Sequence, residues 1–389
     1  MSSLRPLLFT VFCTLVSCSS TLIAPGANPA PFIYNGSTAL ATLDSPSGAA
    51  LRIVLLERAP AGGWSPRSVL ASDSTPGASL GSSCCRQLAY VRGSHAQDGA
   101  VVCVYRHHVT TPCGSLLYRI RSTRSVDGGA TWAAATDVLT ATTALDQPFL
   151  HSPPAPFPAG VLRVILSSEL SVGGEQDLVQ LESADGGRSW GNVTARVHTA
   201  ASRNGAPGVS HLADGSLLCV FEGYGGPGGW GALTVNSVRS FDGGASWGQP
   251  TLLHAPPAGY NAGSPKIGLC AKDEHLNSYK IIVVFLTDAP IGAATRAQQV
   301  WPDGAWLGVI AGFLDPNNSS LPINMTAAPT GTVPTAASAV LQPMVFMDIV
   351  CKERDAAPDQ DDLRVAYTSE GSAWLTDGTL CLSAGELAT

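Results

Sequence analysis

The sequence predicts an all-β fold, a six-bladed β-propeller that forms a single domain. The main observation is the repeated pattern Ser-x-Asp-Gly-Gly-x-Ser/Thr-Trp, which begins at Ser125, Ser183 and Ser240 and so recurs at nearly equal intervals. A repeat of this length indicates one propeller blade or solenoid unit per interval. In addition, short β-branched runs separated by Gly, Pro and Asp predict strands, and no helical period is sustained for more than a turn or two.

Each copy of the repeat predicts a tight turn between two strands. The Asp carboxylate can accept hydrogen bonds from its own turn, the two glycines can adopt positive φ, and the Trp can fill the space between neighbouring sheets. We therefore expect structural roles for Asp127, Trp132, Asp185, Trp190, Asp242 and Trp247. Trp64, Trp306 and Trp374 lie at similar separations before and after these copies, and they extend the register to six units.

The predicted strands are short and apolar. They cover Leu51–Leu56, Ala100–Tyr105, Leu162–Leu166, Leu217–Phe221, Lys280–Leu286 and Leu363–Tyr367. Residues 317–339, which are rich in Ala, Thr, Pro and Asn, are expected to form a long insertion loop.

Residues 1–20 have the pattern of a secretory signal peptide. Arg5 precedes an apolar run from Leu7 to Val16, and small residues follow. The alternative is a bacterial lipoprotein signal in which Cys18 is acylated. We expect secretion of residues 21–389 as one domain, and five sequons fit a glycosylated eukaryotic protein better: Asn35, Asn192, Asn317, Asn318 and Asn324.

Composition narrows the class of partner. Only 13% of the residues are charged, the formal net charge is −7, and no basic run is present, which argues against nucleic acid and anionic membranes. We expect a monomer that binds a polysaccharide or oligosaccharide. Eight cysteines follow the leader, an even number that favours disulfides in an exported chain, and Cys103 with Cys113 is one plausible pair. No Cys/His spacing resembles a zinc site, so we expect no metal and no cofactor.

Polar residues recur at one end of the predicted blades. If the repeats form the turns between third and fourth strands, then the starts of first strands and the ends of second strands lie on the opposite face. Three first strands begin with Gln147-Pro148, Ala206-Pro207 and Ser264-Pro265, which recur at nearly the same interval as the turn pattern. The expected site at this face contains Arg106, His108, Asp146, Gln147, Glu169, Arg203 and Glu222.

This group of residues suits the cleavage of a glycosidic bond. Glycoside hydrolysis needs two carboxylates, one as acid and one as nucleophile or base, separated by about 5 Å for retention and by roughly 6.5–9.5 Å for inversion. Glu222 follows the apolar strand Leu217–Phe221 and precedes a glycine-rich loop, which makes it the strongest catalytic candidate. Arg106 and Arg203 are expected either to hold the ligand or to pair with these acids.

The three repeats resemble the Asp box of the sialidase-like superfamily. Further stretches resemble glycoside hydrolase family 93, the fungal exo-acting α-L-arabinanases, over residues 80–290. They are Tyr105-Arg106-His107-His108, Ser167-Ser168-Glu169 with Glu175-Gln176-Asp177, and Arg203-Asn204-Gly205-Ala206-Pro207 leading into Val220-Phe221-Glu222. The resemblance implies a retaining reaction with Glu222 as nucleophile and with Arg106, Gln147, Asp177 and Arg203 holding the sugar.

The catalytic acid is where the sequence departs from that family. The family pattern Trp-Glu-Pro-Phe corresponds here to Asp146-Gln147-Pro148-Phe149, and a glutamine cannot donate a proton as an acid does. Either Asp146 or Glu169 takes this role, or the protein binds carbohydrate without cleaving it. A sialidase is the third alternative, although neither Arg-Ile pair, at Arg52 and Arg119, is followed by the Pro of the sialidase motif.

Overall fold

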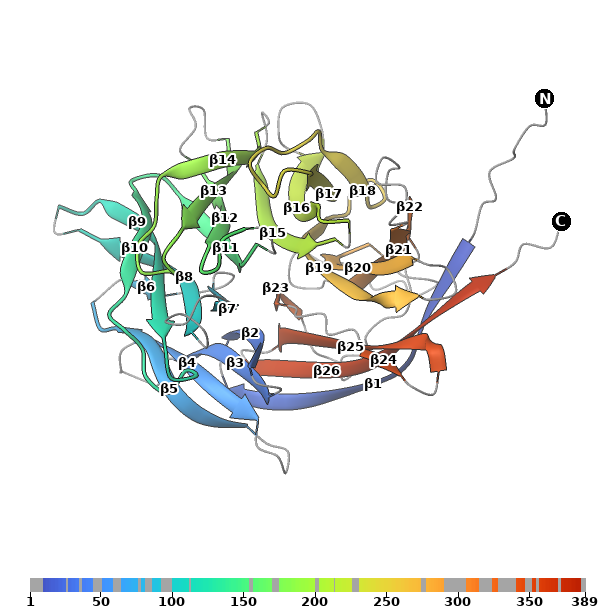
Figure 1. Cartoon of the computed structure of the whole chain (residues 1–389), viewed down its shortest axis with the longest axis horizontal. Helices are drawn as coiled ribbons and strands as arrows, with labels where there is room; N and C mark the ends of the chain where they lie inside the picture. The colour runs from blue at the N-terminus through green and yellow to red at the C-terminus, as the bar shows by residue number, and fades with distance from the viewer. Residues whose placement is uncertain are drawn as a thin grey trace.

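The computed structural model describes a protein built from antiparallel β-sheets. The described residues are 10–25, 27–34, 37–44, 51–58, 64–75, 78–80, 86–91, 100–111, 113–153, 157–169, 175–199, 203–212, 214–225, 231–273, 278–289, 306–314, 324–327, 341–346, 352–354, 357–369 and 372–385. Within these ranges the strands form six sheets and no helix is present. The sheets are arranged around a common centre, as in a propeller (Figure 1).

The sheets follow one another along the chain, and each runs from an inner first strand to an outer fourth strand (Figure 1). The first sheet contains β2 (Ala27–Tyr34), β3 (Ser37–Asp44), β4 (Leu51–Arg58) and β5 (Trp64–Asp73). The second contains β7 (Arg86–Val91), β8 (Ala100–Thr110), β9 (Leu116–Ser125) and β10 (Thr136–Ala141), with β6 (Ser79–Leu80) also paired to β8. The third contains β11 (Leu145–His151), β12 (Leu162–Ser168), β13 (Asp177–Ser183) and β14 (Val193–His198).

The remaining sheets have the same order. The fourth contains β15 (Asn204–His211), β16 (Leu217–Gly225), β17 (Ala232–Ser240) and β18 (Thr251–His254). The fifth contains β19 (Ala262–Asp273), β20 (Ser278–Thr287), β21 (Trp306–Leu314) and β22 (Asn324–Ala327). The last is formed by β23 (Leu341–Phe346), β25 (Ala357–Ser369), β26 (Ser372–Gly385) and β1 (Thr10–Pro25), with β24 (Lys352–Arg354) paired to β25.

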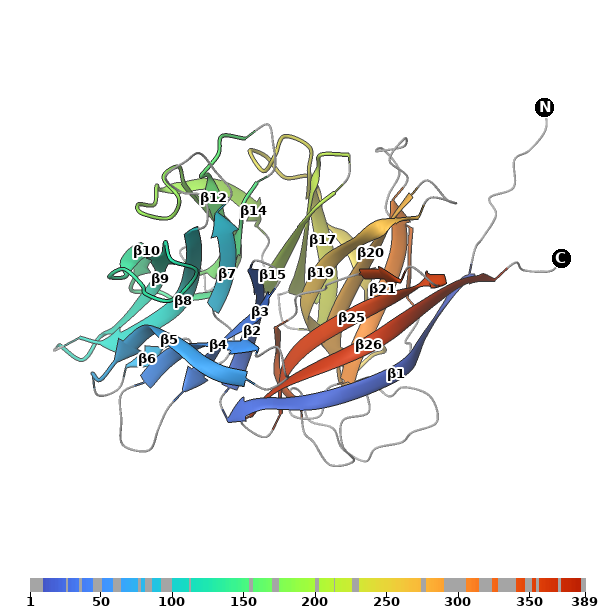
Figure 2. The ribbon, with the colours of Figure 1, turned by 60° about the horizontal axis from the view of Figure 1, so that its bottom comes forward.

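The last sheet joins the two ends of the chain. β1 is its outer strand and pairs antiparallel with β26 from Thr10 to Pro25 (Figure 2). The predicted leader, residues 1–20, overlaps β1, and its removal stays a prediction. β22 falls inside the predicted loop 317–339, and the rest of that range lies outside the described residues.

All six predicted apolar runs lie in strands, and burial on both faces explains their composition. Every residue of β12 is buried. Val164 and Leu166 pack in the cluster shared with β8, whereas Ile165 packs in the cluster shared with β16. Because successive side chains of a strand point to opposite faces, a strand covered by a neighbouring sheet on each side is mostly apolar, and the buried Arg163 of β12 is paired with Glu182.

The three repeats form the turns between third and fourth strands, as predicted. In the first copy, the Asp127 carboxylate accepts hydrogen bonds from the Thr131 N–H at 2.9 Å and the Ser125 hydroxyl at 2.7 Å. Hydrogen bonds from Thr131 and Ser125 hold the pKa of Asp127 below its usual range. The glycine pairs have positive φ in all three copies, at residues 128, 129, 186, 187, 243 and 244.

The repeat tryptophans bridge neighbouring sheets. Trp132 Nε1 donates to the Ser68 hydroxyl of β5 at 3.0 Å, and Trp190 Nε1 donates to the Ser122 hydroxyl of β9 at 2.8 Å. The extension of the register to Trp306 and Trp374 is wrong in detail. These residues lie at the starts of the third strands β21 and β26, not in turns before fourth strands, because the last two sheets lack the Ser-x-Asp-Gly-Gly turn.

The suggested disulfide between Cys103 and Cys113 is also wrong. Cys103 is buried in the middle of β8, whereas Cys113 is exposed in the turn that follows this strand, and no disulfide joins them. The strand from residue 103 to its end at Thr110 extends by about 3.3 Å per residue, which carries the two cysteines beyond the span of a disulfide.

A buried histidine, His151, and a half-buried one, His211, link the third and fourth sheets at the ends of β11 and β15. His151 Nδ1 lies 3.3 Å from His211 Nε2, and Arg163, which pairs with Glu182, is next to both. Burial, together with His211 and Arg163, lowers the pKa of His151. Burial and Arg163 lower the pKa of His211 to about 4.

This pair predicts acid destabilisation. Between pH 6.5 and about 4 the unfolded chain protonates these histidines while the folded chain does not, so stability falls as the pH falls through this window. Thermal unfolding measured at pH 7.5 and pH 5 should show a drop in Tm for the wild type and a smaller drop for His211→Gln. An equal drop in both proteins would show that the pair contributes nothing to acid sensitivity.

Candidate functional site

The first strands of three consecutive sheets begin with the same distorted backbone. Gln147, Ala206 and Ser264 have φ of 50°, 48° and 50°, and each immediately precedes a proline. The register of each first strand against its second strand shifts at this point, as in a β-bulge. Left-handed backbone in a non-glycine residue costs about 1–2 kcal/mol and is characteristic of functional sites.

The bulges bring backbone N–H groups to the end of the sheets opposite the Asp-box turns. The Ser264 N–H donates to Glu222 Oε2 at 2.6 Å, and the Ala206 N–H donates to Gln147 Oε1 at 2.5 Å. A bulge on one sheet therefore fixes a polar side chain on the preceding one. These hydrogen bonds require the side chains to lie on a common face, which is where the sequence predicts them.

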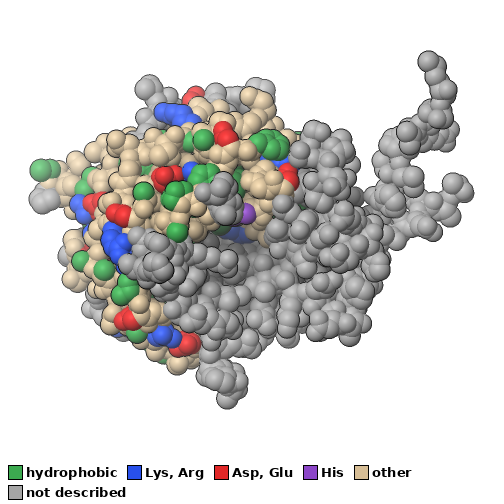
Figure 3. Space-filling model, viewed as in Figure 1, with side chains coloured by type: hydrophobic (Ala, Val, Ile, Leu, Met, Phe, Trp, Pro, Cys, Tyr) green, Lys and Arg blue, Asp and Glu red, His purple; other side chains and the backbone are tan. Residues whose placement is uncertain are grey.

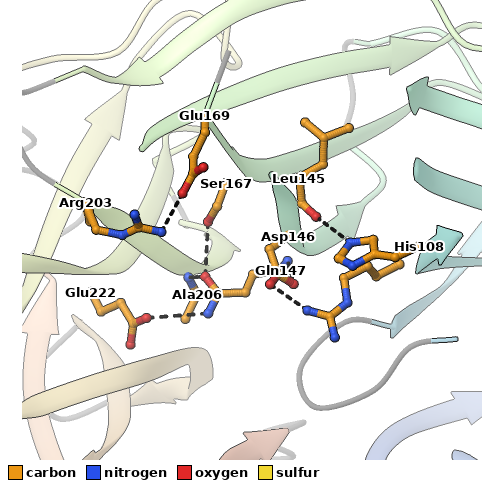
Figure 4. A network of polar contacts seen from close by, with 10 residues as sticks. His108, Leu145, Asp146, Gln147, Ser167, Glu169, Arg203, Ala206 and Glu222 are labelled. Atoms are coloured by element: carbon orange, nitrogen blue, oxygen red, sulfur yellow. Dashed lines mark hydrogen bonds and ion pairs between the residues drawn. The ribbon is translucent and has the colours of Figure 1, made fainter. Parts of the chain in front are cut away.

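Gln147 lies at the centre of this network and faces Glu222 (Figure 4). Gln147 Nε2 lies 3.5 Å from Glu222 Oε1. Burial raises the pKa of the Glu222 carboxyl, although the Ser264 N–H, the Gln147 amide and Lys266 all favour its charged form. Glu222 is therefore an oriented, half-buried carboxylate whose oxygens both have a donor.

The orientation of the Gln147 amide is fixed by its partners. Its Oε1 accepts hydrogen bonds from the Ala206 N–H and from the Ser167 hydroxyl, the latter at 3.1 Å, which leaves Nε2 to face Glu222 (Figure 4). Gly205 makes this approach possible. A Cβ at Gly205 would lie 2.3 Å from Gln147 Oε1 and 3.0 Å from Glu222 Oε1.

The two other predicted carboxylates are bound by arginines. Asp146 Oδ2 accepts from Arg106 Nη1 at 2.6 Å, and Asp146 Oδ1 accepts from the Gln147 N–H at 2.9 Å. Glu169 Oε1 accepts from Arg203 Nη2 at 2.6 Å, and the Arg203 side chain keeps 34% of its surface exposed. Of the two roles expected for these arginines, ligand clamp or partner of the acids, the structure shows the second (Figure 4).

His108 borders the same network. Its Nε2 lies 3.3 Å from the Leu145 carbonyl, and its ring meets Tyr118 edge-on at 4.5 Å. Burial and the neighbouring Arg106 lower the pKa of His108. In the space-filling view a histidine and basic side chains lie beside a hollow near the centre of the face (Figure 3).

Asp177 has a different environment from the other predicted residues. It is buried at the start of β13, and its carboxylate pairs with Arg196 of the neighbouring strand β14. This pairing holds two strands of one sheet together. The structure thus brings Asp146, Gln147, Glu169 and Glu222 into one connected region with Arg106, His108 and Arg203, and it gives Asp177 a contact within its own sheet.

Sequence reasoning missed three groups that complete the site. They are the Ser264 N–H on Glu222, the Ser167 hydroxyl on Gln147, and Lys266, whose Nζ donates to the Pro207 carbonyl at 3.2 Å and lies 6.0 Å from the centre of the Phe149 ring. The repeated X-Pro pairs were the available signal for the first. Nothing in a linear pattern indicates which side chain a bulge N–H will meet.

Two kinds of feature are absent from the described residues. No group of three His, Cys, Asp or Glu side chains there lies close enough to hold a metal ion. No helix in the part that the structure describes is long and apolar enough to cross a membrane.

Solved structures share the fold, although no protein-family profile and no curated protein sequence matches the chain. The α-L-arabinofuranosidase Arb93A of Fusarium graminearum, solved with an iminosugar inhibitor, superimposes with a TM-score of 0.60 at 16% identity, over 93% of this chain and 97% of that one. A GH93 α-L-arabinofuranosidase of Fusarium graminearum, solved with arabinobiose, has a TM-score of 0.58 at 16% identity.

Two sialic-acid enzymes are also similar. The intramolecular trans-sialidase of Ruminococcus gnavus has a TM-score of 0.53 at 11% identity and covers 90% of this chain and 94% of its own. The NanB sialidase of Streptococcus pneumoniae has a TM-score of 0.56 at 10% identity and covers 90% of this chain and 68% of its own. At these identities the likeness establishes the fold, a β-propeller of the kind found in glycosidases.

Two glycines of β15 offer a matched test of the site's packing. Gly205→Ala should displace Gln147 and Glu222 and lower the free energy of unfolding by about 1–3 kcal/mol, because its Cβ meets both side chains. Gly208→Ala serves as control, since its Cβ would make only ordinary contacts, the nearest at 3.5 Å. The two should be compared by chemical unfolding and by crystal structures, and equal stability would contradict the packing described here.

Proposed function

We propose that this chain is a secreted glycoside hydrolase, a six-bladed propeller that takes the non-reducing end of an arabinan-like polysaccharide. The observation that carries the proposal is the Glu222 carboxylate, oriented by the Ser264 N–H and facing Gln147 at the end of the first strands. The six sheets formed by the described strands support the blade number. The fold likeness to an arabinofuranosidase solved with arabinobiose supports the sugar class.

Glu222 has the properties that a nucleophile in glycoside cleavage needs. One oxygen is held by a backbone N–H, which fixes the direction of the carboxylate, and the other lies 3.5 Å from the amide nitrogen of Gln147. Lys266 favours the charged form that attacks the anomeric carbon. Arg203, with its exposed edge, and His108 are the proposed partners of the sugar hydroxyls.

Asp146 and Glu169, the two acid candidates from the sequence, are poorly placed to act as the catalytic acid. Each accepts a hydrogen bond from an arginine at 2.6 Å, and a carboxylate in such a pair is an acceptor with no proton to give. We therefore expect slow cleavage of an ordinary polysaccharide bond. A general acid typically contributes 10²–10⁴-fold to the rate, roughly the amount by which we expect cleavage to be slowed.

A non-catalytic carbohydrate-binding propeller is the second candidate. The specific observation in its favour is Gln147, a neutral amide in the position where a retaining enzyme would place its second carboxyl group. A sialidase is less well supported. Its ligand carboxylate needs a cluster of arginines, and both predicted arginines of this site are already bound to carboxylates.

The first test compares wild type with Glu222→Gln on linear arabino-oligosaccharides, with a sialoside as control substrate. We expect slow release of arabinose or arabinobiose by the wild type in long incubations, and loss of release in the variant with retained binding in calorimetry. Binding without release by either protein would favour the non-catalytic propeller. Release from the sialoside alone would move the substrate class to sialic acids.

Secretion has a separate test. Asn192 of the sequon Asn192-Val193-Thr194 is exposed just before β14, where a glycan can be attached. Expression of the full chain in a eukaryotic secretory host should yield a protein in the medium whose mass shows an N-terminus near residue 21 and glycan on Asn192. Retention of the intact N-terminus inside the cell would contradict the proposal.

A further inference from the structure

We propose that Gln147 limits the catalytic step of this site to glycosides whose leaving group departs without a proton, such as aryl or acyl glycosides with an acidic aglycone. The inference rests on the proposed function, because it assigns Glu222 as nucleophile. It adds that the amide facing Glu222 is a determinant of substrate class.

The first step of the argument concerns Gln147 itself. Its Oε1 accepts from the Ala206 N–H and the Ser167 hydroxyl, and its Nε2 faces Glu222 at 3.5 Å. All of these contacts match an amide, whose N–H hydrogens are hydrogen-bond donors but not acids. The side chain that stands across from the nucleophile can hold a leaving oxygen but cannot protonate it.

The neighbouring carboxylates do not replace it. Asp146 is bound by Arg106 and also accepts from the Gln147 N–H, while Glu169 is bound by Arg203. Both are hydrogen-bond acceptors in this arrangement. Lys266 donates to the Pro207 carbonyl, and an ammonium group is a poor acid at neutral pH. Among the described residues that contact Glu222 or Gln147, none is a suitable proton donor.

The charge on the leaving group in the first step explains this limit on the substrate. A Glu222 oxygen attacks the anomeric carbon, the bond between that carbon and the leaving oxygen breaks, and its electron pair stays on the leaving group. A phenolate or carboxylate carries this charge without protonation, whereas the alkoxide of a sugar does not.

The second half of the reaction should also show the effect of an amide at residue 147. Water attacks the same carbon, Glu222 leaves with the electron pair of the ester bond, and the proton of water passes to solvent. Gln147 cannot assist as a general base, since an amide cannot accept this proton. The glycosyl-enzyme should therefore accumulate. An anionic nucleophile such as azide, which has no proton to lose, should accelerate its breakdown and give the glycosyl azide.

The experiment uses the full chain as wild type, Gln147→Glu, Glu222→Gln and Ser167→Ala, the last a control that removes one hydrogen bond to Gln147 without adding an acid. The substrates are 4-nitrophenyl α-L-arabinofuranoside and linear arabinotriose. We expect the wild type to release nitrophenolate in a rapid burst followed by a slower steady state. Azide should raise the steady-state rate. Gln147→Glu should raise the rate of arabinotriose cleavage by roughly 10²–10⁴-fold. It should raise the burst rate on the nitrophenyl substrate far less. Ser167→Ala should raise neither rate.

Three outcomes separate the inference from its premise. If the wild type cleaves arabinotriose as fast as Gln147→Glu, an acid is present and the inference is wrong. If no Glu222-dependent cleavage of either substrate occurs in any variant, the proposed function itself fails. If a Tm measurement shows that Gln147→Glu is unfolded, the wild type alone still tests the inference. The two readouts are the ratio of its cleavage rates on the two substrates and the formation of glycosyl azide. Comparable rates on both substrates, with no effect of azide, would overturn the inference.

Discussion

The hydrogen bond from the Ser264 N–H to Glu222 depends on a backbone that the chain adopts only at a cost. Ser264 has positive φ and precedes a proline, and the same conformation recurs at Gln147 and Ala206. In each case the bulge at the start of a first strand turns an N–H out of the ladder. The Ala206 and Ser264 N–H groups then bind side chains of the preceding sheet, so that the alignment of the site is a consequence of the contact between sheets.

The sheets tolerate this local strain because their second strands are deeply buried. β12 has neighbours on both faces, and its side chains alternate between the clusters shared with β8 and with β16. At the other end of the sheets, the Asp-box turns satisfy their own polar groups and send Trp132 and Trp190 to serines of the preceding sheet. Rigid turns at one end and packed strands in the middle leave the opposite end to be shaped by a few polar residues.

Two carboxylates at that end form ion pairs. Asp146 pairs with Arg106 and Glu169 pairs with Arg203, whereas Glu222 accepts from neutral donors, the Ser264 N–H and the Gln147 amide. Burial raises the pKa of this group while its donors and Lys266 oppose the shift. These opposing effects on its pKa distinguish Glu222 from its neighbours. Because residue 147 contacts Glu222, its identity determines which reactions the site can support.

The sequence by itself determined the repeat, the apolar second strands, the turn residues and the face on which the polar residues meet. These features follow from local rules, since a turn and a strand are each encoded within one short stretch of chain. It misplaced Trp306 and Trp374 because the last sheets lack the repeat turn, and it suggested a disulfide between Cys103 and Cys113 because spacing does not reveal strand direction. Only the tertiary structure decided which polar residues touch. Gln147, Glu222 and Ser264 lie far apart in the chain and on three different sheets, and such pairings depend on how neighbouring sheets pack and where their bulges lie.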